Sequence, residues 1–213
     1  MFRLIFPAKC VLCGQLLQRN ETDLCHSCRE NTEKFTKSKH NISFVAHWTA
    51  LWYYKENVRK SIQRFKFCRK RHYANTYGRL LAMKLAGSLA EDADILSWVP
   101  VSGLRKLHRG YDQSQLLCQA IGKELGIPVT PVLKKIRHTP PQSSLRDASQ
   151  RHANISGAYK VLQPRELAGK RILLIDDVIT TGATGSECAR VLLTAGAKQV
   201  FLAAIAAAQH DKK

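Results

Sequence analysis

The stretch RILLIDDVITTGAT, residues 171–184, constrains the fold of this chain more than any other feature. Its apolar first half is typical of a parallel strand that is buried on both faces. Beyond it, apolar residues recur at the spacing of a helix with one buried stripe, namely at Cys188, Val191, Leu192 and Ala195. The stretch is therefore predicted to join a strand, a tight turn and a helix.

Further strands and helices alternate with this unit after residue 90. Strands are predicted in ADILSWVPV, near residues 132–137 and 155–161, and in KQVFLAAIA, with an earlier one in FVAHWTALWYY. This order predicts an α/β fold with a parallel sheet and helices on its faces, in which ligands bind at the carboxyl ends of the strands.

Three more helices are predicted from the same periodicity. Two cover residues 57–68 and 71–90, and the third lies in YDQSQLLCQAIGKELG. Asp112 and Gln115 would form a capping-box-like start of the third helix, and Gly126 would end it.

Two CxxC pairs separated by eleven residues lie near the N-terminus, in KCVLCGQLLQRNETDLCHSC. Each pair places two thiolates on one side of a tight turn, and two such turns supply the four soft ligands of a tetrahedral zinc site. Disulfides are the alternative, but nothing in the sequence indicates export to an oxidising compartment. We predict a closed, structural zinc site formed by Cys10, Cys13, Cys25 and Cys28.

The zinc site suggests how the chain divides. Residues 1–41 are predicted to be a zinc module with its connector, because so short a segment cannot bury a core without its metal. Residues 42–213 are predicted to be the α/β domain. No apolar run approaches the ~20 residues that span a bilayer, so we expect a cytoplasmic protein that is not itself transmembrane.

The charge of the chain is strongly unbalanced, with 34 Lys and Arg against 16 Asp and Glu and a formal net charge of +18. Self-repulsion of this kind favours a polyanionic partner. Residues 58–73 combine basic side chains with aromatic ones, which suits a single nucleic-acid strand. The spacing of Val58, Ile62 and Phe65 equally fits the core face of a helix, so composition leaves DNA binding open. The candidate contacts are Arg59, Lys60, Arg64, Lys66, Arg69, Lys70 and Arg71.

The turn inside residues 171–184 is a candidate phosphate site. Gly182 permits close backbone approach, the amides of the first helical turn point outward, and neighbouring threonines add hydroxyl donors. Asp176 and Asp177 lie just before it, where they would suit sugar hydroxyls or a hydrated Mg²⁺. The sequence has no GxxxxGK[ST] loop and no GxGxxG after a strand, which argues against an ATPase and a dinucleotide fold. A purely structural turn is the remaining alternative.

Three motifs and the zinc module carry a family resemblance. ILLIDDVITTGAT resembles the phosphoribosyl pyrophosphate motif of type I phosphoribosyltransferases. Together with VPVSGLRKLHRGYDQSQLL (99–117), RHTPPQSSLRDASQRHANISGAY (137–159) and the two CxxC turns, it makes the chain similar to the ComF/GntX family of competence-associated proteins. The resemblance implies a type I phosphoribosyltransferase-like fold with an N-terminal zinc-ribbon-like module.

The resemblance also implies roles for individual residues. The acidic pair, Asp176 and Asp177, would orient the ribose as the catalytic residues. The phosphoribosyl site would comprise Asp176, Asp177, Val178, Thr180, Thr181, Gly182, Ala183 and Thr184. A pyrophosphate loop would present Ser102, Gly103, Arg105 and Arg109.

Two more features follow from the resemblance. The polar loop at residues 138–152 would close over the site as a lid. The family usually shows RGFNQ where this chain has RGYDQ at residues 109–113, so a ligand contact of Asp112 is left open.

The function that the resemblance implies is competence. The protein would handle incoming single-stranded DNA on the cytoplasmic side during natural transformation, and its pocket would bind phosphoribosyl pyrophosphate or a related sugar phosphate. Its partners would include a DNA-translocating helicase or a membrane DNA channel. The alternative is an active, Mg²⁺-dependent phosphoribosyltransferase with an unidentified small acceptor. The fold does not decide between them, because it hosts non-catalytic members.

Overall fold

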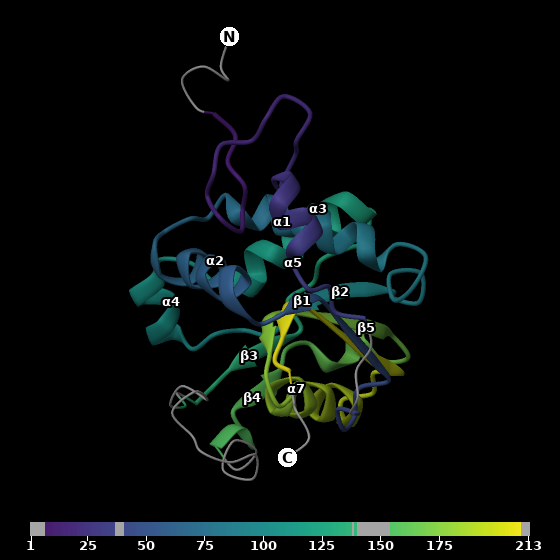
Figure 1. Ribbon diagram of the computed structural model, residues 1–213. Helices are drawn as coiled ribbons and strands as arrows, with labels where there is room; N and C mark the ends of the chain where they lie inside the picture. Colours follow the sequence, from purple (N-terminus) through teal and green to yellow (C-terminus); the bar gives the residue numbers. More distant parts are fainter. Residues whose placement is uncertain (1–6, 37–40, 138, 140–153, 210–213) are drawn as a thin grey trace.

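The central feature of the computed structural model, which describes residues 7–36, 41–137, 139 and 154–209, is a parallel sheet. Four strands lie in the order β1-β6-β5-β2 (Figure 1). Their bounds are His47–Tyr53 (β1), Ile95–Trp98 (β2), Arg171–Ile179 (β5) and Gln199–Ala207 (β6). A separate antiparallel pair consists of Leu133–Lys135 (β3) and Tyr159–Val161 (β4). The predicted α/β fold with a parallel sheet is confirmed.

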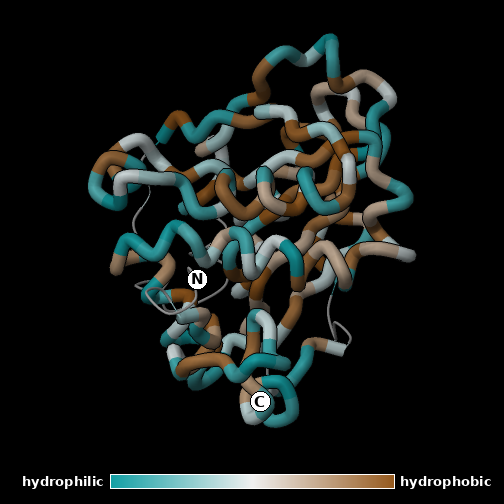
Figure 2. The backbone as a smooth tube through the Cα atoms, turned by 90° about the horizontal axis from the view of Figure 1, so that it is seen from above, coloured by the Kyte–Doolittle hydropathy of each residue, from teal (hydrophilic) through white to brown (hydrophobic). Residues whose placement is uncertain are grey.

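Helices cover both faces of this sheet. On one side lie α2 (Glu56–Phe67), α3 (Tyr73–Leu85) and α5 (Gln113–Leu125), and on the other lies α7 (Ala183–Thr194) (Figure 1). The alternation of side chains along a strand divides β5 between two cores. Leu173 and Ile175 pack with the first group of helices, whereas Ile172 and Leu174 pack with α7. Seen from above in Figure 2, apolar residues gather in the interior and polar ones follow the outer turns.

The N-terminal segment packs directly on the α/β domain. It contains α1 (His26–Asn31), and its Val11 and Leu12 share a core with α2, α3 and α5. A guanidinium nitrogen of Arg64 donates to the carbonyl oxygen of Leu12 at 2.6 Å, and the Ser61 hydroxyl donates to that of Val11. The zinc module therefore depends on α2 for part of its support, while the predicted boundary at residue 41 stays a prediction.

Two elements differ from the sequence-based expectation. Residues 102–111, expected to be a loop, contain the helix α4 (Gly103–Arg109). Leucine, arginine and lysine are good helix formers, and Gly110, at φ +78°, ends the helix in the left-handed conformation. Strand β5 also continues past the predicted RILLID to Ile179, because it remains paired with β6 as far as Ala207. The short 3₁₀ helix η3 (Pro164–Leu167) precedes β5.

In the part of the chain that the structure describes, no helix has the length and the apolar character that crossing a bilayer requires. The cytoplasmic location stays a prediction.

Candidate functional site

The two adjacent carboxylates lie near the carboxyl end of β5, beside the first turn of α5. Asp177 is buried and Asp176 is half-buried. The Oδ1 atom of Asp176 accepts hydrogen bonds from the Asp177 amide at 2.8 Å and from the Ser114 hydroxyl at 3.2 Å. Sequence analysis did not predict a role for Ser114, because only its position in the helical turn after Asp112 distinguishes it from other serines. The start of α5 thus orients one carboxylate of the pair.

The environment of Asp176 favours its neutral form. Burial, followed by the negative charge of Asp177, raises the pKa of Asp176 to about 7. The Asp177 amide, the Lys66 ammonium and the Ser114 hydroxyl oppose that rise. Near neutral pH the Asp176 carboxyl can therefore exist in either protonation state, as a donor or as an acceptor.

The other carboxylate has a lysine partner. The Lys66 ammonium, from the last turn of α2, lies 2.7 Å from Oδ1 of Asp177. Sequence analysis assigned Lys66 to the nucleic-acid contacts, but the structure places it at the acidic pair. No periodicity could have predicted this contact, because it joins residues 111 positions apart, from 66 to 177.

The turn between β5 and α7 is built for close approach. Gly182 has φ +78°, and a Cβ atom there would lie 2.7 Å from the Ile42 side chain. Any other residue would be strained and would also clash. The Thr181 hydroxyl accepts from the Ala183 amide at 3.4 Å, which satisfies one amide of the first helical turn.

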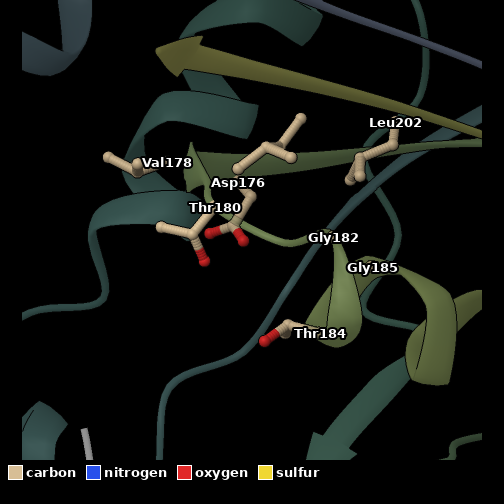
Figure 3. A pocket seen from close by; sticks show the side chains of 8 residues that line it. Asp176, Val178, Thr180, Gly182, Thr184, Gly185 and Leu202 are labelled. Atoms are coloured by element: carbon tan, nitrogen blue, oxygen red, sulfur yellow. The ribbon is translucent and has the colours of Figure 1, made fainter. Parts of the chain in front are cut away.

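A small hollow opens beside this turn. Its volume is about 210 Å³ with open solvent included, and Figure 3 shows the side-chain oxygens of Asp176, Thr180 and Thr184 turned toward one opening. The hollow is lined by Asp176, Val178, Ile179, Thr180, Gly182, Thr184, Gly185 and Leu202. Five of the predicted phosphoribosyl residues thus line one hollow. Ala183 instead lies in the core beneath the turn.

Two basic side chains lie within electrostatic range of the acidic pair. Burial, followed by the charge of Arg109, lowers the pKa of Arg105, and Asp177 partly offsets this. Burial, followed by the charge of Arg105, lowers the pKa of Lys135 to about 8, and Asp176 is among the groups that oppose it. Arg105 was predicted, but Lys135 in β3 was missed, because nothing distinguishes it from the neighbouring lysine in sequence.

The rest of the predicted pyrophosphate loop lies in and around α4. Arg109 donates to Oε1 of Gln113 at 2.7 Å, and its guanidinium lies 5.1 Å from the Phe67 ring centroid. Ser102 is buried and Gly103 is exposed. Gln113, which sequence analysis missed, is fully buried, and within the described residues its Nε2 atom has no hydrogen-bond partner.

Asp112 has a structural role in this region. Its Oδ1 accepts from the Gln115 amide at 3.2 Å, so it caps α5, as predicted. Its Oδ2 accepts from the Val101 amide at 3.1 Å, and this hydrogen bond connects the segment after β2 to the start of α5. Burial raises the pKa of this carboxyl despite both hydrogen bonds.

The four N-terminal cysteines form a compact cluster. The Sγ atoms of Cys10, Cys13, Cys25 and Cys28 all lie within 4.8 Å of one another. Burial would raise the pKa of Cys10, but hydrogen bonds from the amides of Cys13, Cys25 and Leu12 outweigh it and lower the pKa to about 7. Amides that stabilise a thiolate suit a metal ligand, and a set of four thiols fits tetrahedral zinc.

Comparison with known families covers both regions of the chain. A model described as a phosphoribosyl transferase domain matches residues 112–213, and one described as a double zinc ribbon domain matches residues 1–39. A relative named competence protein F, from Haemophilus influenzae, is 27% identical over 92% of this chain and 95% of its own length. The predicted resemblance to ComF-type competence proteins is thereby confirmed.

Two further matches cover a smaller share of the proteins that are matched. The DNA utilization protein YhgH of Salmonella typhi is 31% identical over 65% of this chain and 62% of its own length. Among solved structures, the glutamine phosphoribosylpyrophosphate amidotransferase of B. subtilis is similar with a TM-score of 0.43 and 23% identity. That match covers 62% of this chain and 26% of the amidotransferase. The chain thus spans about six tenths of YhgH and a quarter of the amidotransferase.

The two domain models and the four-cysteine cluster confirm the type I phosphoribosyltransferase-like fold with its zinc-ribbon module. The proposed lid, residues 138–152, lies outside the described residues except for Thr139, whose carbonyl accepts from Arg105 at 2.8 Å. The roles predicted for the individual site residues stay predictions.

The predicted nucleic-acid contacts separate into two groups. Arg64 and Lys66 are half-buried and bonded to other parts of the protein. The other five are exposed, namely Arg59, Lys60, Arg69, Lys70 and Arg71. The Phe67 side chain, next to the last three, is 62% exposed. Only the exposed group is placed where it can meet a strand from solvent.

Proposed function

We propose that this protein acts in natural transformation by handling single-stranded DNA on the cytoplasmic side, and that its pocket binds a phosphoribosyl group. A role in competence is supported by the family and by relatives named as competence proteins. The single observation that carries the pocket is the hollow lined by Asp176, Thr180, Gly182 and Thr184.

Each part of a ribose phosphate has a suitable partner in or beside this hollow. A 5′-phosphate would lie at the start of α7, where backbone amides and the hydroxyls of Thr180 and Thr184 donate. The ribose hydroxyls would donate to Asp176, which lines the hollow, and to its neighbour Asp177. A pyrophosphate on the anomeric carbon would extend toward Arg105 and Lys135, two basic side chains besides Lys66 that interact with the pair.

The pocket is tested by titrating ribose 5-phosphate and phosphoribosyl pyrophosphate in a calorimeter. Thr184→Val removes one hydroxyl from the hollow, and we expect about tenfold weaker binding, as for a lost hydrogen bond to a charged group. Thr194→Val, at the other end of α7, is the matched control, because its hydroxyl donates to the Arg190 carbonyl of its own helix and does not line the hollow. Equal affinity in the two variants would contradict the assignment of the phosphate to this turn.

The DNA role rests on the exposed basic group and its neighbouring aromatic ring. Arg69, Lys70 and Arg71 lie within four residues of the exposed Phe67, so cations for a nucleic-acid backbone and an aromatic ring for base stacking are close in the chain. The YhgH relative is named a DNA utilization protein, which agrees with this assignment. We propose that a DNA-translocating helicase or a membrane DNA channel exchanges the strand with this surface.

The DNA role is tested by fluorescence anisotropy with a labelled single-stranded oligonucleotide over a range of salt concentrations. Replacing Arg69, Lys70 and Arg71 by Ala should weaken binding and flatten its salt dependence. Replacing the exposed Lys160, Lys170 and Lys198 by Ala removes the same charge elsewhere and should change binding less. Identical losses in both triple variants would mean that net charge, rather than this surface, binds the strand.

A second function is favoured by one observation. Arg105 and Lys135 lie within range of the acidic pair, where they would stabilise a pyrophosphate that leaves the sugar. We propose as the alternative a Mg²⁺-dependent phosphoribosyltransferase, for which the Mg²⁺ would arrive with phosphoribosyl pyrophosphate. Turnover of this compound with a panel of bases and amines tests it, with Asp176→Asn as the inactive control.

A further inference from the structure

The acidic pair already has a cation from the protein itself. The Lys66 ammonium lies 2.7 Å from Oδ1 of Asp177, and the side chains of Lys66 and Asp177 are only 19% and 11% exposed. Among the described residues, Lys66 is the only cation that forms an ion pair with either carboxylate. An ion pair that is so far removed from water is screened little by salt.

The position of Lys66 is set by a well-packed helix. Ile62 and Phe65 of α2 are fully buried, and the Tyr111 hydroxyl donates to the carbonyl oxygen of Phe65. Lys66 follows Phe65 directly, so the position of its backbone is fixed by the packing of Phe65. The ammonium therefore faces the acidic pair because of how α2 packs on the core.

The acidic pair consequently does not fit a Mg²⁺ ion that the chain holds by itself. Oδ1 of Asp177 is taken by Lys66, and Oδ1 of Asp176 accepts from Ser114 and from the Asp177 amide. A divalent cation at Asp177 would have to displace the ammonium or remain close to it, and like charges repel strongly where water is scarce. Neutral sugar hydroxyls meet no such obstacle, because they donate to a carboxylate and leave the ion pair intact.

We propose that Lys66 is the resident counter-cation of the acidic pair and determines its ligand specificity. Lys66 excludes a divalent cation from Asp177 and leaves the pair accessible to sugar hydroxyls. The pocket therefore binds a ribose phosphate without Mg²⁺. The ligand part of this inference rests on the proposed sugar-phosphate pocket, whereas the exclusion of the cation does not.

The exclusion is tested first, with Mn²⁺ alone as the probe and the zinc-loaded full chain. Mn²⁺ binding is followed by electron paramagnetic resonance in the wild type, Lys66→Met and the double variant Lys66→Met/Asp177→Asn. We expect weak binding to the wild type, at least about tenfold tighter binding to Lys66→Met, and loss of that gain in the double variant. Lys123→Met removes the same charge from an exposed position of α5 and should bind Mn²⁺ as the wild type does.

Equal Mn²⁺ affinity in the wild type and Lys66→Met would overturn the proposal. Lys66→Gln is measured in parallel, so that the result does not depend on the folding of one variant. The double variant also controls for misfolding. It removes both charges of the ion pair, so neither a carboxylate nor an ammonium is left buried without its partner.

The ligand part is tested by titrating ribose 5-phosphate into the zinc-loaded protein in buffer that either contains Mg²⁺ or was freed of divalent cations beforehand, with no soluble chelator present. Wild-type affinity should be nearly the same in both buffers, whereas Lys66→Met should bind weakly without Mg²⁺ and recover with it. A wild type that needs Mg²⁺ would overturn the proposal. If no variant binds ribose 5-phosphate, the proposed pocket function fails, and the Mn²⁺ titration still decides whether Lys66 excludes the cation.

Discussion

The zinc centre and the acidic pocket both depend on α2, but they use its cations in different ways. Arg64 donates to the neutral carbonyl oxygen of Leu12 in the cysteine turn, whereas Lys66 neutralises a carboxylate in the pocket. The zinc ligands come from one short segment, and the lining of the hollow is also mostly local, residues 176–185 with Leu202. The acidic pair differs, because Lys66 and Ser114 reach it from distant segments. Each site therefore combines side chains that are close in the chain with support from elsewhere in the fold.

The largest effect is expected at the zinc centre. Cys25→Ser removes one of the four thiolates, and because structural zinc supplies the folding energy of such modules, the metal should be lost and residues 1 to about 35 should unfold. Zinc content and near-ultraviolet circular dichroism measure both effects. Cys68→Ser, at an exposed thiol outside the cluster, should retain its zinc. Full zinc content in Cys25→Ser would rule out a four-cysteine site.

The turn of the pocket is the next most sensitive position. Gly182→Ala should lower the free energy of unfolding by about 1–3 kcal/mol, because alanine is strained at φ +78° and its Cβ would contact Ile42. Urea unfolding provides the measurement. Gly103→Ala has open space around its Cβ and should change the free energy by less than about 0.5 kcal/mol. A similar loss in both variants would show that the turn is not specially constrained.

The acidic pair should show a characteristic pH dependence. The pKa of Asp176 is raised from 3.8 to about 7 in the folded protein, so its contribution to stability is present below pH 4 and is lost as pH rises through 7. Asp176→Asn does not titrate and should be more stable than the wild type by roughly 1–2 kcal/mol at pH 8. Below pH 4 the two should converge. Thermal unfolding across this range tests the sign, and a variant that is less stable at pH 8 would contradict it.

The smallest effect is expected where the two sites meet on α2. Arg64→Met leaves the Leu12 carbonyl without its guanidinium donor and should cost about 1 kcal/mol, the size of a typical intramolecular hydrogen bond. This variant should also lose its zinc at a lower chelator concentration than the wild type. Arg59→Met, on the exposed face of the same helix, should change neither quantity. If Arg59→Met also weakens zinc retention, the effect belongs to net charge and not to the Arg64 contact.

Sequence analysis succeeded where a function depends on neighbours in the chain. The cysteine spacing, the glycine in the turn after β5 and the capping role of Asp112 follow from geometry within a few residues. Sequence analysis did not predict the helix α4 (Gly103–Arg109). The segment follows a strand and was therefore expected to be a loop, although its residues favour a helix. Sequence analysis also missed Gln113, whose burial depends on how α5 packs against the sheet.

The amino-acid sequence by itself determined the ligands of the zinc centre and the strand, turn and helix around Gly182, because both are built from interactions between residues close in the chain. Only the tertiary structure showed that Lys66 forms an ion pair with Asp177, unlike the exposed basic residues near it in the chain. Only the tertiary structure also showed that Lys135 interacts electrostatically with Asp176. Charge composition counts every cation alike. Which cations face solvent and which neutralise a buried carboxylate is set by the packing of the helices on the sheet.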